Sequence, residues 1–429
     1  MARTYKCGLQ LIEFILLLYS FTLLAPRIQT TNTPESCIRQ DETKMPTCSH
    51  FMKPDDNTVL TKLLKQIHVQ QVEMKNEESR TNYQLVEKTV NSMIAAMQKT
   101  NDLFKSMYQR EVYTGSYWDG LRVKSPTEFD LNMVLRMPFK DPDVEIIMND
   151  EVPAFLQYHL QRDVKDILAL NNKKWSFQQK LVDFFDTDRN LLRPQIHSWI
   201  QSVLTTAMQS KHFTKPKGVE KITPSRGGPA FTFYITTTAT NPKAKGVKID
   251  LDLVPVIDGS KHPVPDKIYK SPRFNELNEQ WFMVPKPWTG KGAGKPETYW
   301  RISFPEAEKS LLPTQGCVKI LIKLFKLLRD KQKWDKIASY YIKTLFLLEL
   351  DDSPDPNIWK EKHLGNLFQM MLKKLQNALE DMKLTYYFNR KANLLSGIKR
   401  STCYNYAKRI SKIISKISAS PDAVLIFFA

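Results

Sequence analysis

The sequence is poor in cysteine, and the few cysteines it has are not arranged for disulfides or metal binding. They are five in number, an odd count, and wide gaps separate Cys7, Cys37, Cys48, Cys317 and Cys403. No two of them form a Cys-x-x-Cys pair. Disulfide frameworks use even numbers of cysteines, and structural zinc sites use closely spaced ones. The sequence therefore gives no disulfide framework and favours a reducing compartment.

Acidic residues are scarce relative to basic ones. The chain has 45 Asp and Glu against 63 Lys and Arg, which gives a formal net charge of +18. This excess favours a polyanionic partner, either nucleic acid or an anionic membrane surface, although scattered lysines can also serve solubility alone. Basic residues cluster in three segments, 211–226, 319–336 and 391–416. We expect these segments to include the contacts to phosphates.

The N-terminal region lacks an uninterrupted apolar run of membrane-spanning length. The stretch Leu9–Ala25 is apolar and follows Arg3 and Lys6, which is typical of a signal peptide or an anchor. It is short for a span, and Glu13 interrupts it. Three interpretations stay open: a targeting signal, a membrane-proximal anchor, or a start upstream of the true first residue of a cytosolic enzyme. We expect a cytoplasmic protein.

Proline and glycine are absent between Thr58 and Arg110. A stripe of side chains recurs there at alternating spacings of four and three: Val86, Val90, Met93, Met97, Thr100, Phe104 and Met107. This period predicts one long amphipathic helix. We interpret the helix as a core-facing spine.

The rest of the chain divides into a mixed half and a helical half. Alternation and β-branched content predict strands at 128–137, 231–238 and 247–257, with a turn at Asn241-Pro242, and residues 258–298 should be loop. Helical periodicity marks 199–208, 317–329, 337–350, 358–384 and 404–417. The sequence thus predicts an α+β protein in four parts: an apolar segment with a polar linker (1–56), a mixed core with the spine helix (57–310), a helical lobe (311–417) and a tail (418–429).

Two acids in the first predicted strand form the strongest chemical pattern. Glu128 and Asp130 are two apart, so both carboxylates point to one face while Phe129 points to the core. Adjacent carboxylates repel unless a cation neutralises them, and Mg²⁺ or Mn²⁺ prefers such oxygens. Upstream, Gly115 permits close backbone approach, and Ser116 offers a hydroxyl to a phosphate.

A further acid follows in the segment Lys-Ile-Asp-Leu-Asp, residues 248–252. Asp250 and Asp252 again lie on one face of a predicted strand. One of them would complete a cage for two ions and polarise an attacking hydroxyl as a general base. The residues alone leave both Asp250 and Asp252 open for this role.

A Gly-Ser pair, a Glu-x-Asp pair and a distal strand Asp together resemble the nucleotidyltransferase signature. The residues around these motifs are similar to those of the cyclic GMP-AMP synthase-like receptors, whose Lys-Ile-Ser-Val-Asp segment resembles residues 248–252. Arg-Gly-Gly-Pro-Ala from Arg226 and Trp-Arg-Ile-Ser-Phe from Trp300 also resemble family segments. The resemblance covers roughly residues 58–400. It implies a bilobal nucleotidyltransferase fold, with a mixed β-sheet catalytic lobe, a long N-terminal spine helix and a C-terminal helical lobe.

The resemblance also implies roles for individual residues. The catalytic and metal-binding residues would be Glu128, Asp130 and Asp252. Nucleotide-binding residues would be Gly115, Ser116, Arg301, Ser303, Glu308, Lys326, Ser339 and Tyr340, with Tyr340 stacking on a base. A single lysine or tyrosine of this kind is more often a surface or core residue. The assignment of nucleotide-binding roles therefore rests on the order and spacing of all these matches along one chain.

The implied activity is synthesis of a cyclic dinucleotide of the cyclic GMP-AMP kind from ATP and GTP, with two Mg²⁺ or Mn²⁺ ions. The chain lacks the cluster of one His and three Cys that holds zinc in the vertebrate DNA-sensing enzyme, so we expect no zinc. Double-stranded RNA is then the expected activator, with DNA as the alternative. We also expect a homodimer on the nucleic acid and a downstream receptor reached through the product alone. The alternatives are a catalytically silent nucleotide- or nucleic-acid-binding scaffold, and an enzyme that makes linear oligomers or transfers single nucleotides.

Overall fold

The computed structural model describes residues 57–73, 76–123, 127–170, 178–225, 230–239, 246–269, 271, 273, 280–290 and 294–429. The apolar segment Leu9–Ala25, the turn at Asn241-Pro242 and the Gly-Gly-Pro segment after Arg226 lie outside these residues. Among the helices within them, none is both long enough and apolar enough to cross a membrane.

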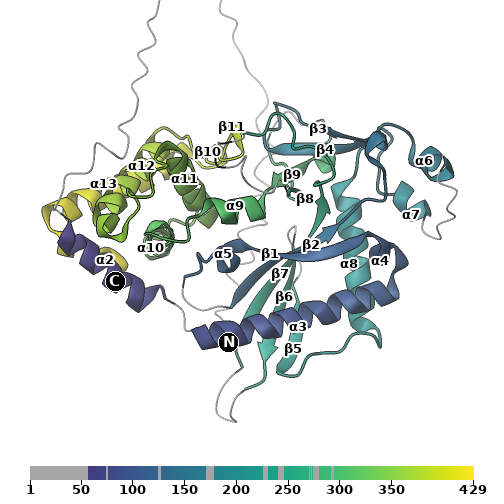
Figure 1. Ribbon diagram of the computed structural model, residues 1–429, viewed down its shortest axis with the longest axis horizontal. Helices are drawn as coiled ribbons and strands as arrows, with labels where there is room; N and C mark the ends of the chain where they lie inside the picture. The colour runs from purple at the N-terminus through teal and green to yellow at the C-terminus, as the bar shows by residue number, and fades with distance from the viewer. Residues whose placement is uncertain are drawn as a thin grey trace, which may run out of the picture. The chain divides into compact units, whose positions relative to one another are not determined.

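A mixed sheet of nine strands forms the centre of the first half (Figure 1). The main path runs β1-β2-β7-β8-β9-β4-β3, and β6, followed by β5, joins the free part of β7. The strands are β1 (Tyr108–Thr114), β2 (Glu128–Leu135), β3 (Val144–Ile147), β4 (Phe155–Leu160), β5 (Val219–Pro224), β6 (Phe231–Thr237), β7 (Lys248–Asp258), β8 (Phe282–Val284) and β9 (Trp300–Ser303). The pair β2 and β7 is parallel, whereas the other neighbours along these paths are antiparallel.

The strand predictions at 128–137, 231–238 and 247–257 are confirmed within two residues. Alternation in β7 explains the success, because Ile249, Leu251 and Leu253 are buried while the residues between them are not. The prediction of loop for 258–298 is wrong at β8. This three-residue strand has two buried side chains, Phe282 and Met283, and is too short to give a periodic signal.

The predicted spine is confirmed as helix but not as one continuous helix. It consists of α2 (Thr58–Gln71), α3 (Asn76–Thr100) and α4 (Asp102–Met107). Asn101 has an extended backbone, and its side chain accepts a hydrogen bond of 2.8 Å from the backbone N–H of Phe104. That contact caps a new helix, so the pattern continues in register across the break. The stripe from Val86 to Met107 lies on the buried side, and α3 packs against α8 (Arg193–Gln209).

The second half is helical, as predicted. It contains α9 (Pro305–Leu311), α10 (Val318–Lys331), α11 (Ser339–Asp352), α12 (Leu364–Glu380), the hairpin β10 (Thr385–Tyr386) and β11 (Asn389–Asn393), and α13 (Arg400–Ala419). The shorter helices of the first half are α5 (Gly115–Trp118), α6 (Val164–Leu170) and α7 (Gln178–Val182). The residues expected to form a tail instead form α14 (Val424–Phe428), which packs against α2, α10 and α13.

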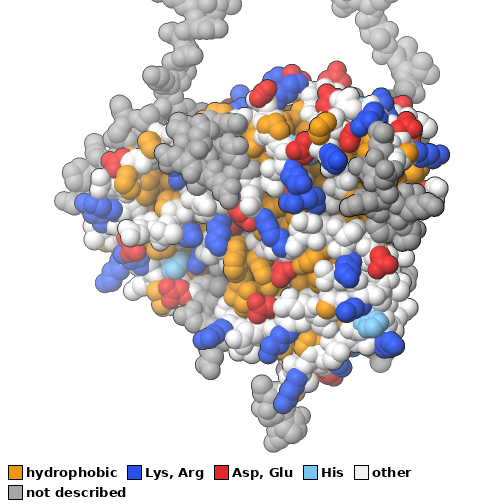
Figure 2. Space-filling model, turned by 45° about the vertical axis from the view of Figure 1, so that its right-hand side comes forward, with side chains coloured by type: hydrophobic (Ala, Val, Ile, Leu, Met, Phe, Trp, Pro, Cys, Tyr) orange, Lys and Arg blue, Asp and Glu red, His pale blue; other side chains and the backbone are white. Residues whose placement is uncertain are grey.

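Surface charges are mixed on the face drawn in Figure 2, where Lys and Arg alternate with Asp and Glu. The positive excess is therefore not gathered into one patch on that face. The first half and the helical half share one hydrophobic core that runs from α2 to α14.

Because Phe428 is 1% exposed and Ile426 is 66% exposed, α14 offers a matched pair of substitutions. We expect Phe428→Ala to lower the free energy of unfolding by about 3 kcal/mol through lost burial and a cavity. Ile426→Ala should change it by less than about 0.5 kcal/mol. Urea unfolding of the two variants measures the difference, and equal effects would show that α14 does not contribute to the core.

Candidate active site

The parallel pairing of β2 with β7 brings together acids that lie far apart in the sequence. In this register Asp130 lies beside Asp252, and Glu128 lies beside Asp250. Side chains two apart on a strand share a face, so all four acids lie on one face of two adjacent strands. The three acids expected to act together, Glu128, Asp130 and Asp252, are therefore neighbours.

The acids do not form a ready-made ion cage. In the part of the chain that the structure describes, no three or more His, Cys, Asp or Glu side chains are grouped so that they could hold a metal ion. Two of the carboxylates are turned to other partners. Glu128 forms an ion pair with Arg122, and Asp252 accepts a hydrogen bond of 2.5 Å from the hydroxyl of Thr232 on β6.

Asp130 is the acid most affected by its neighbours. Burial, together with the negative charges of Glu128 and Asp252, raises the pKa of its carboxyl to about 7, against the lowering effect of Arg122. Such a group carries surplus negative charge when ionised, and a divalent cation relieves that surplus. The donor set on this face therefore fits Mg²⁺ or Mn²⁺.

The Gly115-Ser116 pair lies directly against this acid. Thr114, the last residue of β1, is paired with Asp130 on β2. Gly115 has φ of +75°, and a Cβ atom there would lie 1.9 Å from Oδ2 of Asp130. Only glycine fits this position, because any other side chain would collide with the carboxylate and strain the backbone. Gly115 begins the short helix α5, and the backbone oxygen of Ser116 accepts a hydrogen bond of 2.8 Å from the N–H of Leu121.

A cavity of about 390 Å³ opens between the sheet and the helices. Sheet residues on its wall include Glu128 and Asp130, and α5 contributes Gly115 and Ser116. The helices contribute Glu308, Lys326, Ser339 and Tyr340. Asp252 is not on the wall, although Val254, two residues further along the same face of β7, is. Most of the predicted site residues are thus brought to one cavity.

A second, larger cavity of about 730 Å³ adjoins the first. Ser303, Glu308 and Tyr340 line both cavities. Arg301 lines the larger one, where its guanidinium lies 4.5 Å from the ring centre of Tyr386. The two cavities together provide room for two nucleotide-sized ligands that would meet near Ser303.

Several predicted ligand residues are held by protein partners. The ammonium of Lys326 donates a 2.8 Å hydrogen bond to the backbone oxygen of Leu121. The hydroxyl of Ser339 accepts one of 2.6 Å from the guanidinium of Arg329. The hydroxyl of Tyr340 donates one of 2.9 Å to Glu308. These contacts fix the side chains in place before any ligand arrives.

A buried ion network that no sequence pattern predicted lies behind these residues. The ammonium of Lys343 lies 2.7 Å from Oδ2 of Asp119 and 2.7 Å from Oε2 of Glu308, and each of the three side chains is less than a tenth exposed. Asp119 follows α5 directly, Glu308 lies on α9, and Lys343 lies on α11. The network therefore ties the Gly115-Ser116 turn to the helical half. Lys343 belongs to the Ser-Tyr-Tyr-Ile-Lys-Thr segment, but spacing alone gave no sign of its partners.

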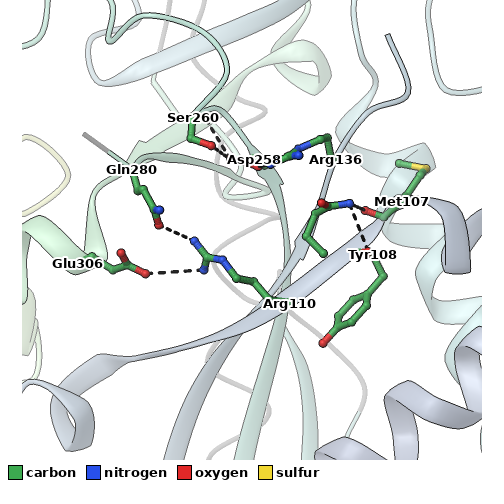
Figure 3. Close-up of polar contacts among 9 residues, drawn as sticks. Met107, Tyr108, Arg110, Arg136, Asp258, Ser260, Gln280 and Glu306 are labelled. Carbon is green, nitrogen blue, oxygen red and sulfur yellow. Dashed lines mark hydrogen bonds and ion pairs between the residues drawn. The ribbon is translucent and has the colours of Figure 1, made fainter. Parts of the chain in front are cut away.

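Arginines at the opposite end of β1 and β2 fasten the sheet to its surroundings (Figure 3). Arg110 donates a hydrogen bond of 2.5 Å to the side chain of Gln280, and it lies 3.7 Å from Glu306 at the start of α9. Arg136, just after β2, forms an ion pair of 2.6 Å with Asp258 at the end of β7. These contacts hold the register of β2 and β7 and the position of α9.

Comparisons with known proteins find related domains over residues 117–412. The Mab-21 protein nucleotidyltransferase domain matches residues 117–314, and the Mab-21 protein HhH/H2TH-like domain matches residues 315–412. The chain is similar to a cyclic GMP-AMP synthase-like receptor of Tribolium castaneum, with 31% identity over 84% of this chain and 90% of the relative. One from Ctenocephalides felis is 30% identical over 76% and 77%. Cyclic GMP-AMP synthase of Mus musculus is 26% identical over 72% and 61%.

Lys326 gives the site a pH-dependent stability. Burial, together with the charges of Arg122 and Arg329, lowers the pKa of Lys326 from 10.5 to about 8. The unfolded chain then binds more protons between these values, so stability rises with pH across that window. Below pH 8 Lys326 is charged in the folded protein, and the free energy of unfolding is lowered by the full cost of burying this cation. We expect Lys326→Met to raise the free energy of unfolding by about 2 kcal/mol at pH 7.

The matched control is Lys336→Met, at an exposed lysine. Thermal unfolding of both variants between about pH 7 and pH 10 should show an advantage for Lys326→Met alone, and that advantage should shrink above pH 8. A Lys326→Met protein that is less stable than the wild type at pH 7 would contradict this account of the site.

Proposed function

The chain belongs to the cyclic GMP-AMP synthase-like receptors and carries the Mab-21 nucleotidyltransferase domain, and from this premise we propose that it joins ATP and GTP into a cyclic dinucleotide when duplex RNA binds it. The observation that carries the proposal is the placement of Asp130 between Glu128 and Asp252, directly against the Gly115 turn. A catalytically silent scaffold has no need of three neighbouring acids beside the Gly115 turn.

Glu128, Asp130 and Asp252 are the residues that would hold Mg²⁺ or Mn²⁺, and such ions, when bound, supply positive charge to the triphosphate and the departing pyrophosphate. Arg122 must release Glu128 for this to happen, since the two are paired in the free protein. Thr232 donates to Oδ1 of Asp252 and so holds that carboxylate in one orientation. The other oxygen of Asp252, which lies beside Asp130 although outside the cavity wall, would then accept the proton of the attacking ribose hydroxyl.

The remaining residues of the smaller cavity suit a triphosphate. Ser116 and Lys326 both line this cavity, so that a hydroxyl and an ammonium are available to phosphates. A polyanion in the cavity would favour the charged form of Lys326 and offset the cost of burying it. Tyr340 offers a ring for a base, because its hydroxyl is already fixed by Glu308.

The larger cavity suits the second nucleotide. Arg301 is held over the ring of Tyr386, so its planar guanidinium is preorganised for hydrogen bonds to a base or a phosphate. Ser303 lies where the two cavities meet. Two nucleotides bound in this way would bring the ribose of one close to the α-phosphate of the other, which is the arrangement that in-line transfer requires.

Activation by duplex RNA is supported by the net charge of +18 and by basic residues close to the turn. Trp118, the last residue of α5, is 38% exposed, and the ammonium of Lys309 lies 4.2 Å from its ring centre. Lys319, in the basic segment 319–336, lines the same surface depression. A phosphate backbone that engages these lysines would bear directly on α5 and order the Gly115-Ser116 turn. Duplex RNA is recognised through its backbone and shape, so no sequence-reading motif is needed.

The test is a product assay on the full chain with labelled ATP and GTP, Mn²⁺, and either duplex RNA, duplex DNA or no nucleic acid. We expect Asp252→Ala to reduce product at least a hundredfold, because it removes an ion ligand and the proton acceptor. Asp250→Ala is the matched control, two residues earlier on the same face of β7, and should retain most of the activity.

Each other outcome has a definite meaning. Wild-type protein that forms no product with either duplex points to the silent scaffold, and a linear product seen by mass spectrometry points to an oligomer-forming enzyme. Loss of activity in Asp250→Ala, with activity retained in Asp252→Ala, would exchange the roles of the two acids.

A further inference from the structure

Exposed apolar side chains gather at one end of the helical half. Among the described residues, seven large hydrophobic side chains are exposed, and five of them lie on α2, α13 and α14: Val59, Val69, Tyr404, Leu425 and Ile426. The helix α14 packs against both α2 and α13. Single exposed apolar residues are ordinary, but their concentration on three neighbouring helices needs an explanation.

The helix α13 is strongly basic on its outer side. Its 20 residues include no Asp or Glu. Cys403, Ala407 and Ile410 mark its buried side, and the exposed residues include Arg400, Lys408, Arg409, Lys412 and Lys416. Lys408, Lys412 and Lys416 are four apart and form one stripe along the helix. This cationic stripe, without acids, differs from the mixed charges of the face in Figure 2.

The helix α14, which carries Leu425 and Ile426, packs against α13, which carries the cationic stripe. The guanidinium of Arg409 donates a hydrogen bond of 2.6 Å to the backbone oxygen of Gln332. The side chain of Gln332 in turn donates one of 3.1 Å to the backbone oxygen of Phe427. This chain of contacts joins α14 to the side of α13 that carries Arg409.

We propose that this surface, which we term the α13–α14 surface (Tyr404, Lys408, Lys412, Lys416, Leu425 and Ile426), binds an anionic lipid bilayer. Lysines attract the negative headgroups, each contributing about 1 kcal/mol near the surface. Leu425 and Ile426, which are 45% and 66% exposed, enter the interface between headgroups and acyl chains. Tyr404 has the amphipathic ring that is favoured at that depth, and the ammonium of Lys408 lies 4.6 Å from its centre.

A duplex nucleic acid would use fewer of the side chains of the α13–α14 surface than a bilayer would. Its phosphates would pair with the lysines but would gain nothing from Leu425 and Ile426, which would stay in water. The sequence also contains the apolar stretch Leu9–Ala25. One apolar segment is a weak anchor, and a basic patch is the usual second signal.

Co-sedimentation of the full chain with vesicles tests the proposal. The vesicles are phosphatidylcholine alone, or phosphatidylcholine with about one third phosphatidylserine. We expect the triple variant K408E/K412E/K416E to bind the anionic vesicles at least tenfold less than the wild type does. The matched control K211E/K217E/K221E changes the net charge equally at exposed lysines elsewhere and should lose less than about twofold.

A second variant separates the apolar contribution. L425S/I426S removes the apolar side chains and keeps every charge. Its vesicle binding should therefore fall several-fold, and the remaining electrostatic binding should become more sensitive to salt. Equal losses for the two triple variants would overturn the proposal, because they would show a non-specific charge effect. Unchanged vesicle binding of K408E/K412E/K416E, with reduced binding to duplex RNA, would assign the surface to nucleic acid instead. Thermal unfolding of each variant confirms that the fold is intact.

Discussion

The parallel pairing of β2 with β7 is the constraint on which the site depends. It places Asp130 beside Asp252, across about 120 positions of sequence, and forces like charges onto one face. Burial, together with the negative charges of Glu128 and Asp252, raises the pKa of Asp130. A bound divalent cation would offset the cost of ionising this carboxyl. Arginine pairs at the far end of the strands, notably Arg136 with Asp258, hold the register against this repulsion.

The helical half also contains charged side chains that are costly to bury. Lys343 is buried between Asp119 and Glu308, and Lys326 is buried with a lowered pKa. Buried charges seldom stabilise a fold more than apolar residues of equal volume would. Their value here is positional, because the Lys343 network connects the turn that faces the acids with the two helices that line both cavities. A change in the position of α5 is therefore felt by the sheet and by the helices together.

Much of the fold was predictable from the sequence, and the reasons are physical. Alternation in β7 and the helical stripe from Val86 to Met107 are local patterns. The ends of β2 and β7 were predicted within two residues, and the stripe is helical, although it is interrupted at Asn101. What the sequence did not reveal depends on distant partners. The register that pairs Asp130 with Asp252, the salt bridges of Lys343 and the short strand β8 have no local periodicity. The sequence pattern did not predict the break at Asn101, because α4 begins directly after its cap and the spacing of the apolar stripe is preserved.

The central claim is that the carboxylates of β2 and β7 form one site for a divalent cation. Electron paramagnetic resonance titration of the full chain with Mn²⁺, in the presence of a non-hydrolysable ATP analogue, tests it independently of turnover. The account predicts saturable binding that Asp130→Asn weakens at least tenfold and that Asp250→Asn leaves nearly unchanged. Mn²⁺ binding that is equally strong in wild type and Asp130→Asn would contradict it.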